Sequence, residues 1–210
     1  MLIPFKYLCE QYKIAPEGVI HVGAHYAEEI HDYYQNGVER TFWIEANPFV
    51  YETLQSTINK LDYPQIIASC ACLSDKVGET TFNLTNNSQS SSMLDLAYHK
   101  VAHPEVHVTE VVTLKTTTLD AEMEYLTDRG LSFDFLNADI QGAELMMLKG
   151  ATKALQYLKY LYLEVNQKPL YEGCAMIEEI DQFVFQFGFE RKEVAWCGNF
   201  GWGDAFYVKK

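Results

Sequence analysis

Short apolar segments alternate with longer amphipathic ones along most of the chain, and this alternation constrains the fold more than any other feature. Short runs of branched and aromatic residues are typical of strands, and apolar residues recurring every three or four positions are typical of helices. We expect strands at 19–22, 41–44, 65–70, 133–138, 160–165, 189–194 and 205–209. We expect helices at 27–36, 49–60, 119–128, 143–157 and 176–187.

Strands that alternate with helices form a mostly parallel sheet with helices on both faces. The 210 residues suffice for one domain with a full core and are few for two. We therefore predict a single α/β domain over residues 1–210, with a seven-stranded, mostly parallel sheet and a helical extension over residues 1–17. Gly37, Gly130 and Gly188 follow expected helices as C-terminal caps, and Gly150 is expected to divide the fourth helix.

Charge and hydropathy restrict the partners that the chain can have. A formal net charge of −13 opposes contact with nucleic acid and anionic membranes, which bind clustered Lys and Arg. No stretch approaches the roughly 20 apolar residues that cross a bilayer, and the segment Met1–Lys6 does not resemble a signal peptide. We expect a cytoplasmic protein without a nucleic-acid or membrane partner. The oligomeric state is left open, with a homodimer as one alternative.

The first expected strand runs into the glycine turn Gly23-Ala24-His25, and open α/β sheets bind ligands where strands end in this way. Glu45 ends the second strand, at the spacing from which an acid binds a ribose diol. The dinucleotide motif G-x-G-x-x-G requires glycine where this chain has His25 and Glu28. A side chain and a carboxylate at these positions would crowd and repel a pyrophosphate.

The turn therefore favours S-adenosylmethionine over a nicotinamide dinucleotide. S-adenosylmethionine has a ribose but no pyrophosphate, and Glu28 or Glu29 would attract its ammonium and sulfonium groups. The same two acids are also favourable as charges in the first turn of a helix. A nicotinamide-dependent oxidoreductase and a noncatalytic binding protein of the same fold are the alternatives.

Five motifs together resemble the FkbM-type methyltransferases over roughly residues 18–170. They are His-Val-Gly-Ala-His at 21–25, Ile-Glu-Ala-Asn-Pro at 44–48, Leu-Ser-Asp-Lys-Val-Gly-Glu at 73–79, Thr-Leu-Asp at 118–120 and Leu-Asn-Ala-Asp-Ile-Gln-Gly-Ala-Glu-Leu-Met-Met-Leu-Lys-Gly-Ala at 136–151. The last is the most specific, because family members typically read L-K-I-D-V-E-G-x-E-x-x-V-L-x-G-A there. Gln141 replaces the usual acid.

The resemblance implies a Rossmann-like methyltransferase fold, S-adenosylmethionine as methyl donor, and transfer commonly to a hydroxyl of a sugar or secondary metabolite. By position, the glycine turn would hold the methionine and ribose part of the cofactor, Glu45 the ribose, and the 74–75 region the adenine. The predicted cofactor-binding residues are Gly23, Ala24, His25, Glu29, Glu45, Ala46, Ser74, Asp75 and Asp139.

A hydroxyl acceptor needs a base to take its proton as the methyl group is transferred. Asp139, at the end of the fourth parallel strand, is the first candidate, and the alternative is that it caps the following helix together with Glu144. His25, His99 and His103 are further candidates, because imidazole titrates near pH 6.5, although packing is the alternative for each. The candidate acceptor-binding residues are Gln141, Glu144, Glu164 and Asn166.

The polar segment 86–92 leads into a stretch with three histidines and is either a mobile lid or a plain surface loop. His99, His103 and His107 have helical spacing for a zinc site, but Pro104 interrupts that helix. A hard divalent ion on Asp139 and nearby acids is an alternative that oxygen ligands would suit. We predict no metal and expect the acceptor to be a small molecule or a glycan.

Overall fold

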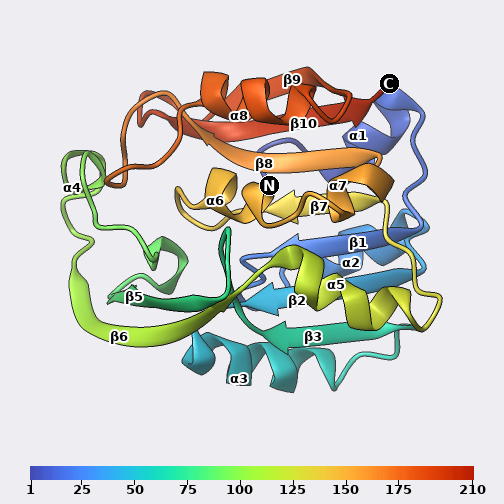
Figure 1. Ribbon diagram of the computed structural model, residues 1–210, viewed down its shortest axis with the longest axis horizontal. Helices are drawn as coiled ribbons and strands as arrows, with labels where there is room; N and C mark the ends of the chain where they lie inside the picture. Colours follow the sequence, from blue (N-terminus) through green and yellow to red (C-terminus); the bar gives the residue numbers. More distant parts are fainter.

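The computed structural model describes all 210 residues and contains a seven-stranded main sheet (Figure 1). Its strand order is β3-β2-β1-β7-β8-β10-β9. The strands are β1 (Gly18–Val22), β2 (Arg40–Glu45), β3 (Ile66–Cys70), β7 (Phe135–Ala138), β8 (Tyr160–Asn166), β9 (Phe189–Trp196) and β10 (Trp202–Lys209). The first five are parallel, and β10 runs antiparallel to β8 and β9. All seven predicted strands and the mostly parallel sheet are confirmed.

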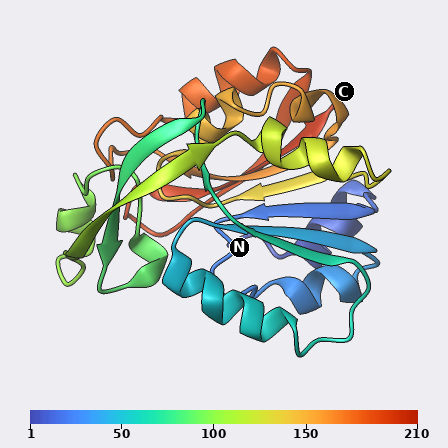
Figure 2. The same ribbon diagram turned by 60° about the horizontal axis from the view of Figure 1, so that its bottom comes forward.

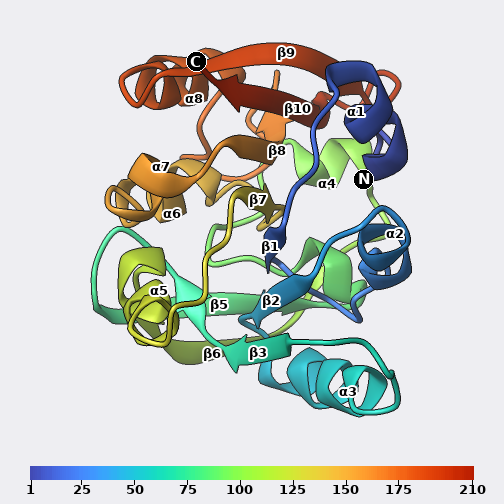
Figure 3. The ribbon, with the colours of Figure 1, turned by 90° about the vertical axis from the view of Figure 1, so that its right-hand side faces the viewer.

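Helices cover both faces of this sheet (Figure 3). One face carries α1 (Phe5–Tyr12), α2 (Ile30–Gln35) and α3 (Pro48–Ile58), and the other carries α5 (Leu119–Thr127), α6 (Glu144–Lys149), α7 (Ala154–Tyr157) and α8 (Ile177–Phe185). The predicted break at Gly150 separates α6 from α7. A Cβ atom on Gly150 would lie 2.2 Å from the carbonyl oxygen of Ser74, so the chain passes too close there for a side chain.

Alternation of side chains along the strands divides the core into two layers. On β2, Phe42 and Ile44 pack with α5 to α8, whereas Trp43 packs with α1 to α3. Neighbouring strands repeat this pattern, because successive side chains of a strand point to opposite faces. The central strands β1, β2, β7 and β8 are therefore buried on both faces, as parallel strands usually are. The edge strands β3 and β9 are only partly buried.

A second, three-stranded sheet was not predicted. It contains β4 (Cys72–Leu73), β5 (Gly78–Thr85) and β6 (Val108–Thr117) in the order β4-β6-β5, and it extends beyond the carboxyl ends of β1 to β3 (Figure 2). Most of β6 is exposed, so its sequence lacks the apolar pattern of a core strand. The connection between β5 and β6 contains the 3-10 turn η1 (Ser88–Ser90) and the short helix α4 (His99–Ala102).

Two further elements differ from or refine the prediction. Helix α2 begins at Ile30 and not at Ala27, because His25 and Ala27 have φ of 43° and 62°, in the left-handed region that an α-helix excludes. Within residues 1–17, helix α1 ends at Tyr12, because the next residue, Lys13, also has a left-handed φ of 53°. None of the helices has the combination of length and apolar character that crossing a bilayer requires.

Candidate active site

A cavity of about 380 Å³ opens at the carboxyl ends of the parallel strands, where the glycine turn was expected to bind a ligand. Its floor is formed by four chain segments, namely the turn after β1, the end of β2, the residues after β7 and the end of β8. Residues 87–91, between β5 and β6, form part of its wall. A volume of this size is typical of sites for small molecules.

Most of the predicted site residues line this cavity. They are Gly23, Ala24, His25, Glu29, Glu45, Ala46, His99, His103, Asp139, Gln141 and Glu164. Four others do not line it, namely Ser74, Asp75, Glu144 and Asn166. Ser74 is buried against Gly150, and its hydroxyl donates to the Asp75 carboxylate at 3.2 Å. Asn166 is buried at the end of β8, where its Nδ2 has no hydrogen-bond partner.

Glu45 joins the first two strand ends. Its Oε2 accepts a hydrogen bond from the His25 backbone N–H at 2.9 Å, and its Oε1 accepts one from the Asn47 N–H at 2.8 Å. Burial raises the pKa of Glu45, and these amide donors act in the opposite direction. Each oxygen accepts a single backbone bond and so retains capacity for a further donor. The carboxylate is thus fixed in orientation and still available to a ligand.

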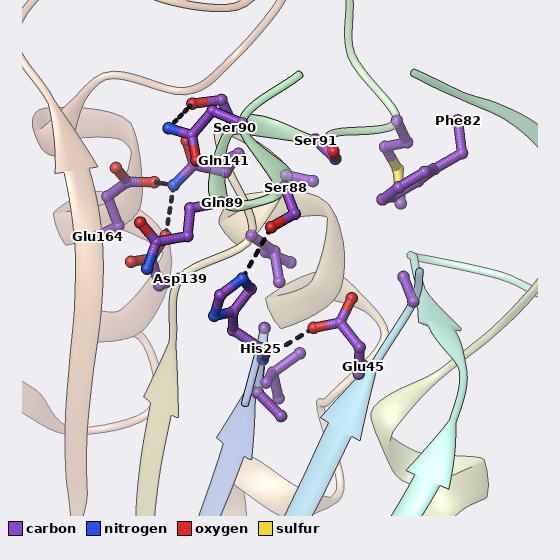
Figure 4. A pocket seen from close by; sticks show the side chains of 18 of the residues that line it. His25, Glu45, Phe82, Ser88, Gln89, Ser90, Ser91, Asp139, Gln141 and Glu164 are labelled. Atoms are coloured by element: carbon purple, nitrogen blue, oxygen red, sulfur yellow. Dashed lines mark hydrogen bonds between the residues drawn. The ribbon is translucent and has the colours of Figure 1, made fainter. Parts of the chain in front are cut away.

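His25 connects the glycine turn to the polar segment 86–92 (Figure 4). Its Nε2 lies 2.9 Å from Ser88 Oγ, and its Nδ1 lies 2.6 Å from a carboxylate oxygen of Glu28. The Ser92 hydroxyl donates to the backbone carbonyl of Gln141 at 2.9 Å, which ties the other end of the segment to the loop after β7. Both ring nitrogens of His25 are therefore engaged, and a role as base would require the Ser88 contact to break.

His99 and His103 approach the cavity from α4 and the residue after it. Their ring centroids lie 4.9 Å apart, and His99 also lies 5.3 Å from the Tyr171 ring. Burial lowers the pKa of His99, and neighbouring His103 lowers it further, so its ring stays neutral at physiological pH. Helix α4 ends at Ala102, and the three histidines do not converge as a metal site.

Asp139 and Glu164 form a carboxyl pair beneath the cavity, with Gln141 between them (Figure 4). The Asp139 side chain is exposed to the cavity, although protein surrounds it closely, whereas Glu164 is buried. Burial raises the pKa of Asp139 to about 6, with a contribution from Asp204, against hydrogen bonds from Gln141 and Glu164. Burial and the charge of Asp139 raise the pKa of Glu164 well above its usual range. Of the two carboxyl groups, Asp139 is therefore the more readily ionised.

Glu144 stabilises the loop before α6 and does not cap that helix, so the capping alternative was wrong. Its Oε1 accepts the backbone N–H of Ile140 at 2.8 Å and that of Gly142 at 3.2 Å. Burial raises its pKa to about 7, and the charge of Asp139 contributes. One oxygen each of Asp139, Glu144 and Glu164 lies within 4.8 Å of the others. Backbone amides and the Gln141 side chain account for this close approach.

Several residues that line the cavity were not predicted as site residues. Phe82 reaches it from β5, Met93 from the connection between β5 and β6, and Leu170 from the loop after β8. Trp202, the first residue of β10, also lines the cavity. Phe82 lies in a strand of mainly polar residues, so only its apolar character within Thr80-Thr81-Phe82-Asn83 distinguishes it. Recognising it required the pairing of β5 with β6, which has no local signal.

Comparison with known proteins identifies the family. The profile described as Methyltransferase FkbM domain matches residues 21–191, which is most of the chain. The chain belongs to the FkbM methyltransferase family. The match confirms the resemblance seen in the motifs and sets the nicotinamide oxidoreductase alternative aside. It extends from the end of β1 into β9 and so includes the carboxyl ends of β1, β2, β7 and β8, which line the cavity.

Among curated proteins, this FkbM methyltransferase is similar to the 2-O-methyltransferase NoeI of Sinorhizobium fredii (strain NBRC 101917 / NGR234). The two are 25% identical over 141 residues, which cover 63% of this chain and 56% of NoeI. The aligned part therefore spans little more than half the length of that relative. The name of NoeI describes methyl transfer to a 2-oxygen.

Solved structures share the fold at low sequence identity. M. capricolum TrmK, bound to S-adenosylhomocysteine, superposes with a TM-score of 0.54 at 10% identity, covering 100% of this chain and 70% of that one. Magnesium protoporphyrin IX methyltransferase of Synechocystis PCC 6803, with S-adenosylmethionine bound, gives 0.56 at 8%, covering 98% and 76%. A methyltransferase of Aquifex aeolicus gives 0.52 at 12%, covering 99% and 91%. These likenesses confirm the Rossmann-like methyltransferase fold.

Proposed function

We propose that the protein is an S-adenosylmethionine-dependent O-methyltransferase that acts on a hydroxyl group of a sugar, glycan or similar small molecule. The observation that carries this proposal is that one cavity contains Glu45, the Gly23 turn and Asp139. In this proposal Glu45 binds the ribose of the cofactor, and Asp139 accepts the proton of the acceptor hydroxyl. The family match supports the reaction class, and the name of the relative NoeI supports an oxygen acceptor.

The cofactor would lie along the turn after β1 with its ribose on Glu45. Beyond Glu45, the cavity wall is apolar and suits the flat faces of an adenine ring. The residues of this wall are Ala46, Ala71, Cys72, Leu73, Phe82 and Met93. They replace Ser74 and Asp75 in our proposal for the adenine subsite. At the opposite end, Glu29 and Asp139 carry negative charge that favours the ammonium and sulfonium groups.

Asp139 is proposed as the base. S-adenosylmethionine would supply an electrophilic methyl group on a positively charged sulfur. As the acceptor oxygen bonds to the methyl carbon, the carbon–sulfur bond breaks with its electron pair on sulfur, and the hydroxyl proton passes to Asp139. A carboxylate with a pKa of about 6 is ionised at neutral pH and retains more basicity than an aspartate with an ordinary pKa. His25, held by Ser88 and Glu28, is the less available base.

The acceptor would enter from the side of α4 and the loop before β10. His103 and Trp202 line this end of the cavity and offer ring faces, and His99 lies beside them. Sugar rings pack on such faces through their C–H groups, and the polar rim of the cavity can bond their hydroxyls. The net charge of −13 favours a neutral or cationic acceptor over a nucleic acid.

Replacement of Glu45 by Ala is expected to weaken S-adenosylmethionine binding by about 10–100-fold, the scale of one or two lost hydrogen bonds to a charged group. Calorimetric titration measures the dissociation constant. Glu52→Ala, on the exposed side of α3, is the matched control and is expected to bind like the wild type. Equal affinity of Glu45→Ala and wild type for S-adenosylmethionine would show that Glu45 does not bind the ribose.

Replacement of Ser88 by Ala is expected to speed cofactor dissociation by about 3–10-fold, because the segment 86–92 loses its bond to the His25 ring. Stopped-flow displacement of S-adenosylhomocysteine measures this rate. Ser56→Ala on exposed α3 serves as the control. An unchanged dissociation rate in Ser88→Ala would show that the segment is a static wall and not a lid.

Transfer of a labelled methyl group from S-adenosylmethionine to a panel of glycosides and oligosaccharides tests the function itself. We expect label in at least one glycoside with a free secondary hydroxyl, released as a methyl ether by hydrolysis of the glycosidic bonds. Cofactor binding without transfer to any acceptor would instead favour the noncatalytic protein. Binding of reduced nicotinamide dinucleotide in place of S-adenosylmethionine would contradict the proposal.

A further inference from the structure

The side-chain amide of Gln141 bridges two acids, Asp139 after β7 and Glu164 on β8. Its Nε2 donates one hydrogen bond to Asp139 Oδ1 at 2.6 Å and another to Glu164 Oε2 at 3.1 Å. An amide nitrogen has two N–H groups, so both are committed inside the protein. Gln141 is thus an internal bridge, and one lone pair of its Oε1 is all that it can offer to an acceptor.

Tyr171 contacts the oxygen end of this amide. Its buried hydroxyl donates to Gln141 Oε1 at 2.6 Å and also lies 3.3 Å from the carbonyl oxygen of Ser90. The Asp139 carboxylate can only accept, so it is the group that draws the amide nitrogen toward the acids. Gln141 also has φ of 58°, a left-handed conformation that is unfavourable for a residue other than glycine. The side chain is held by three hydrogen bonds on a strained backbone, and strain of this kind persists where the surroundings impose it.

We propose that Gln141 is a positioning residue that holds Asp139 and Glu164 as a pair sharing one proton, with Asp139 as the charged member that faces the cavity. This inference deepens the proposed function and rests on it. It reassigns Gln141 and Glu164, which were expected to bind the acceptor, to the support of the base.

The surroundings of the pair allow one negative charge more easily than two. Asp139 and Glu164 each bring a carboxylate oxygen within 4.8 Å of the other. Carboxyl groups this close repel each other when both are charged, so their protons titrate as a coupled system. A proton on Glu164 is stabilised by the neighbouring Asp139 carboxylate. The other ionisable groups that face the pair are Glu144 on α6, Asp204 on β10, the Tyr171 hydroxyl and the amino group of Met1.

The pair therefore has a defined state before and after the reaction. Before transfer, it holds one proton, on Glu164, and Asp139 is a carboxylate. When the acceptor oxygen forms its bond to the methyl carbon, its proton goes to Asp139, and the pair holds two protons. One proton then returns to solvent through the open cavity, which restores the starting state for the next cycle.

Carbon-13 NMR of the aspartate carboxyl carbons tests this arrangement without an acceptor. The Asp139 signal is the one lost in Asp139→Asn, and its midpoint in the wild type is expected at about pH 6. Gln141→Gly suits the left-handed backbone and removes only the side chain. We expect it to raise the Asp139 midpoint by about one pH unit, because the donor that favours the carboxylate is lost.

Two changes at Glu164 separate hydrogen bonding from packing. Glu164→Ala removes the donor and is expected to raise the Asp139 midpoint in the same direction. Glu164→Gln supplies an amide donor of the same length and is expected to return the midpoint to the wild-type value. Glu172→Gln, in an exposed loop, is the control and should have no effect. An unmoved midpoint in Gln141→Gly, or equal midpoints in both Glu164 variants, would overturn the inference.

Calorimetry with S-adenosylmethionine on the same samples keeps the two proposals apart. Cofactor binding by the wild type together with an unmoved Asp139 midpoint in Gln141→Gly would reject the positioning role alone. A wild type that does not bind S-adenosylmethionine would reject the proposed function, and with it the role of the pair as a base. Binding together with the expected shifts would support both.

Discussion

Asp139→Asn is expected to lower methyl transfer by about 10²–10⁴-fold, the usual contribution of a positioned base, while the protein still binds S-adenosylmethionine. The amide keeps the size of the side chain but cannot accept the hydroxyl proton. The measurement is turnover of labelled methyl on an acceptor found in the glycoside panel, with cofactor affinity from calorimetry. Asp62→Asn, at an exposed site away from the cavity, is the control and should retain wild-type turnover.

The same assignment fixes the direction of the pH dependence. Asp139 acts as a base only when ionised, and its pKa is raised to about 6, so turnover should fall as the pH drops through 6, by tenfold for each further unit. Above that pH the rate should be level until another group titrates. Wild-type turnover by Asp139→Asn, or a rate that rises below pH 6, would remove Asp139 as the base.

Gly23→Ala is expected to destroy cofactor binding and to lower the free energy of unfolding by about 3 kcal/mol or more. Gly23 has φ of 80°, and a Cβ atom there would lie 1.8 Å from the backbone carbonyl oxygen of Asp139. Either the turn after β1 or the loop after β7 must move, and these two elements form the floor of the cavity. Thermal unfolding and calorimetric titration measure the two effects.

Gly37→Ala separates backbone strain from the clash. Gly37 has a similar φ of 89°, but a Cβ atom there would meet nothing within 4 Å. This variant is expected to lose only about 1–2 kcal/mol, the cost of a left-handed alanine, and to bind the cofactor normally. Equal losses of stability in the two variants, with cofactor binding retained in both, would contradict this prediction. They would show that the close approach of Gly23 to the Asp139 backbone is not needed for cofactor binding.

The main sheet was predictable because its central strands are buried on both faces. Segments such as Tyr160–Asn166 contain apolar residues that no surface strand would carry, and glycines such as Gly188 mark the helix ends. The start of α2 was predicted wrongly, because the left-handed residues His25 and Ala27 have no glycine to signal them. The second sheet escaped because its strands pair over a long connection and bury little apolar surface.

The location of the candidate site was predictable because it lies at strand ends. Glu45 is the last residue of β2 and Asp139 follows β7 directly, so the parallel sheet had to bring them to one edge. The roles of supporting residues depend on side-chain contacts between distant segments, which the sequence does not reveal. The bond of His25 to Ser88 spans 63 residues and that of Gln141 to Tyr171 spans 30, and neither has a local pattern.

The position of the cofactor relative to the two acids is the central claim, and a crystal structure of the protein with S-adenosylhomocysteine tests it most directly. We predict that both ribose hydroxyls bond to the Glu45 carboxylate and that the sulfur faces the side of the cavity formed by Asp139. The adenine should lie against Phe82 and Met93. A ribose bound away from Glu45, or a sulfur that points away from Asp139, would contradict the account.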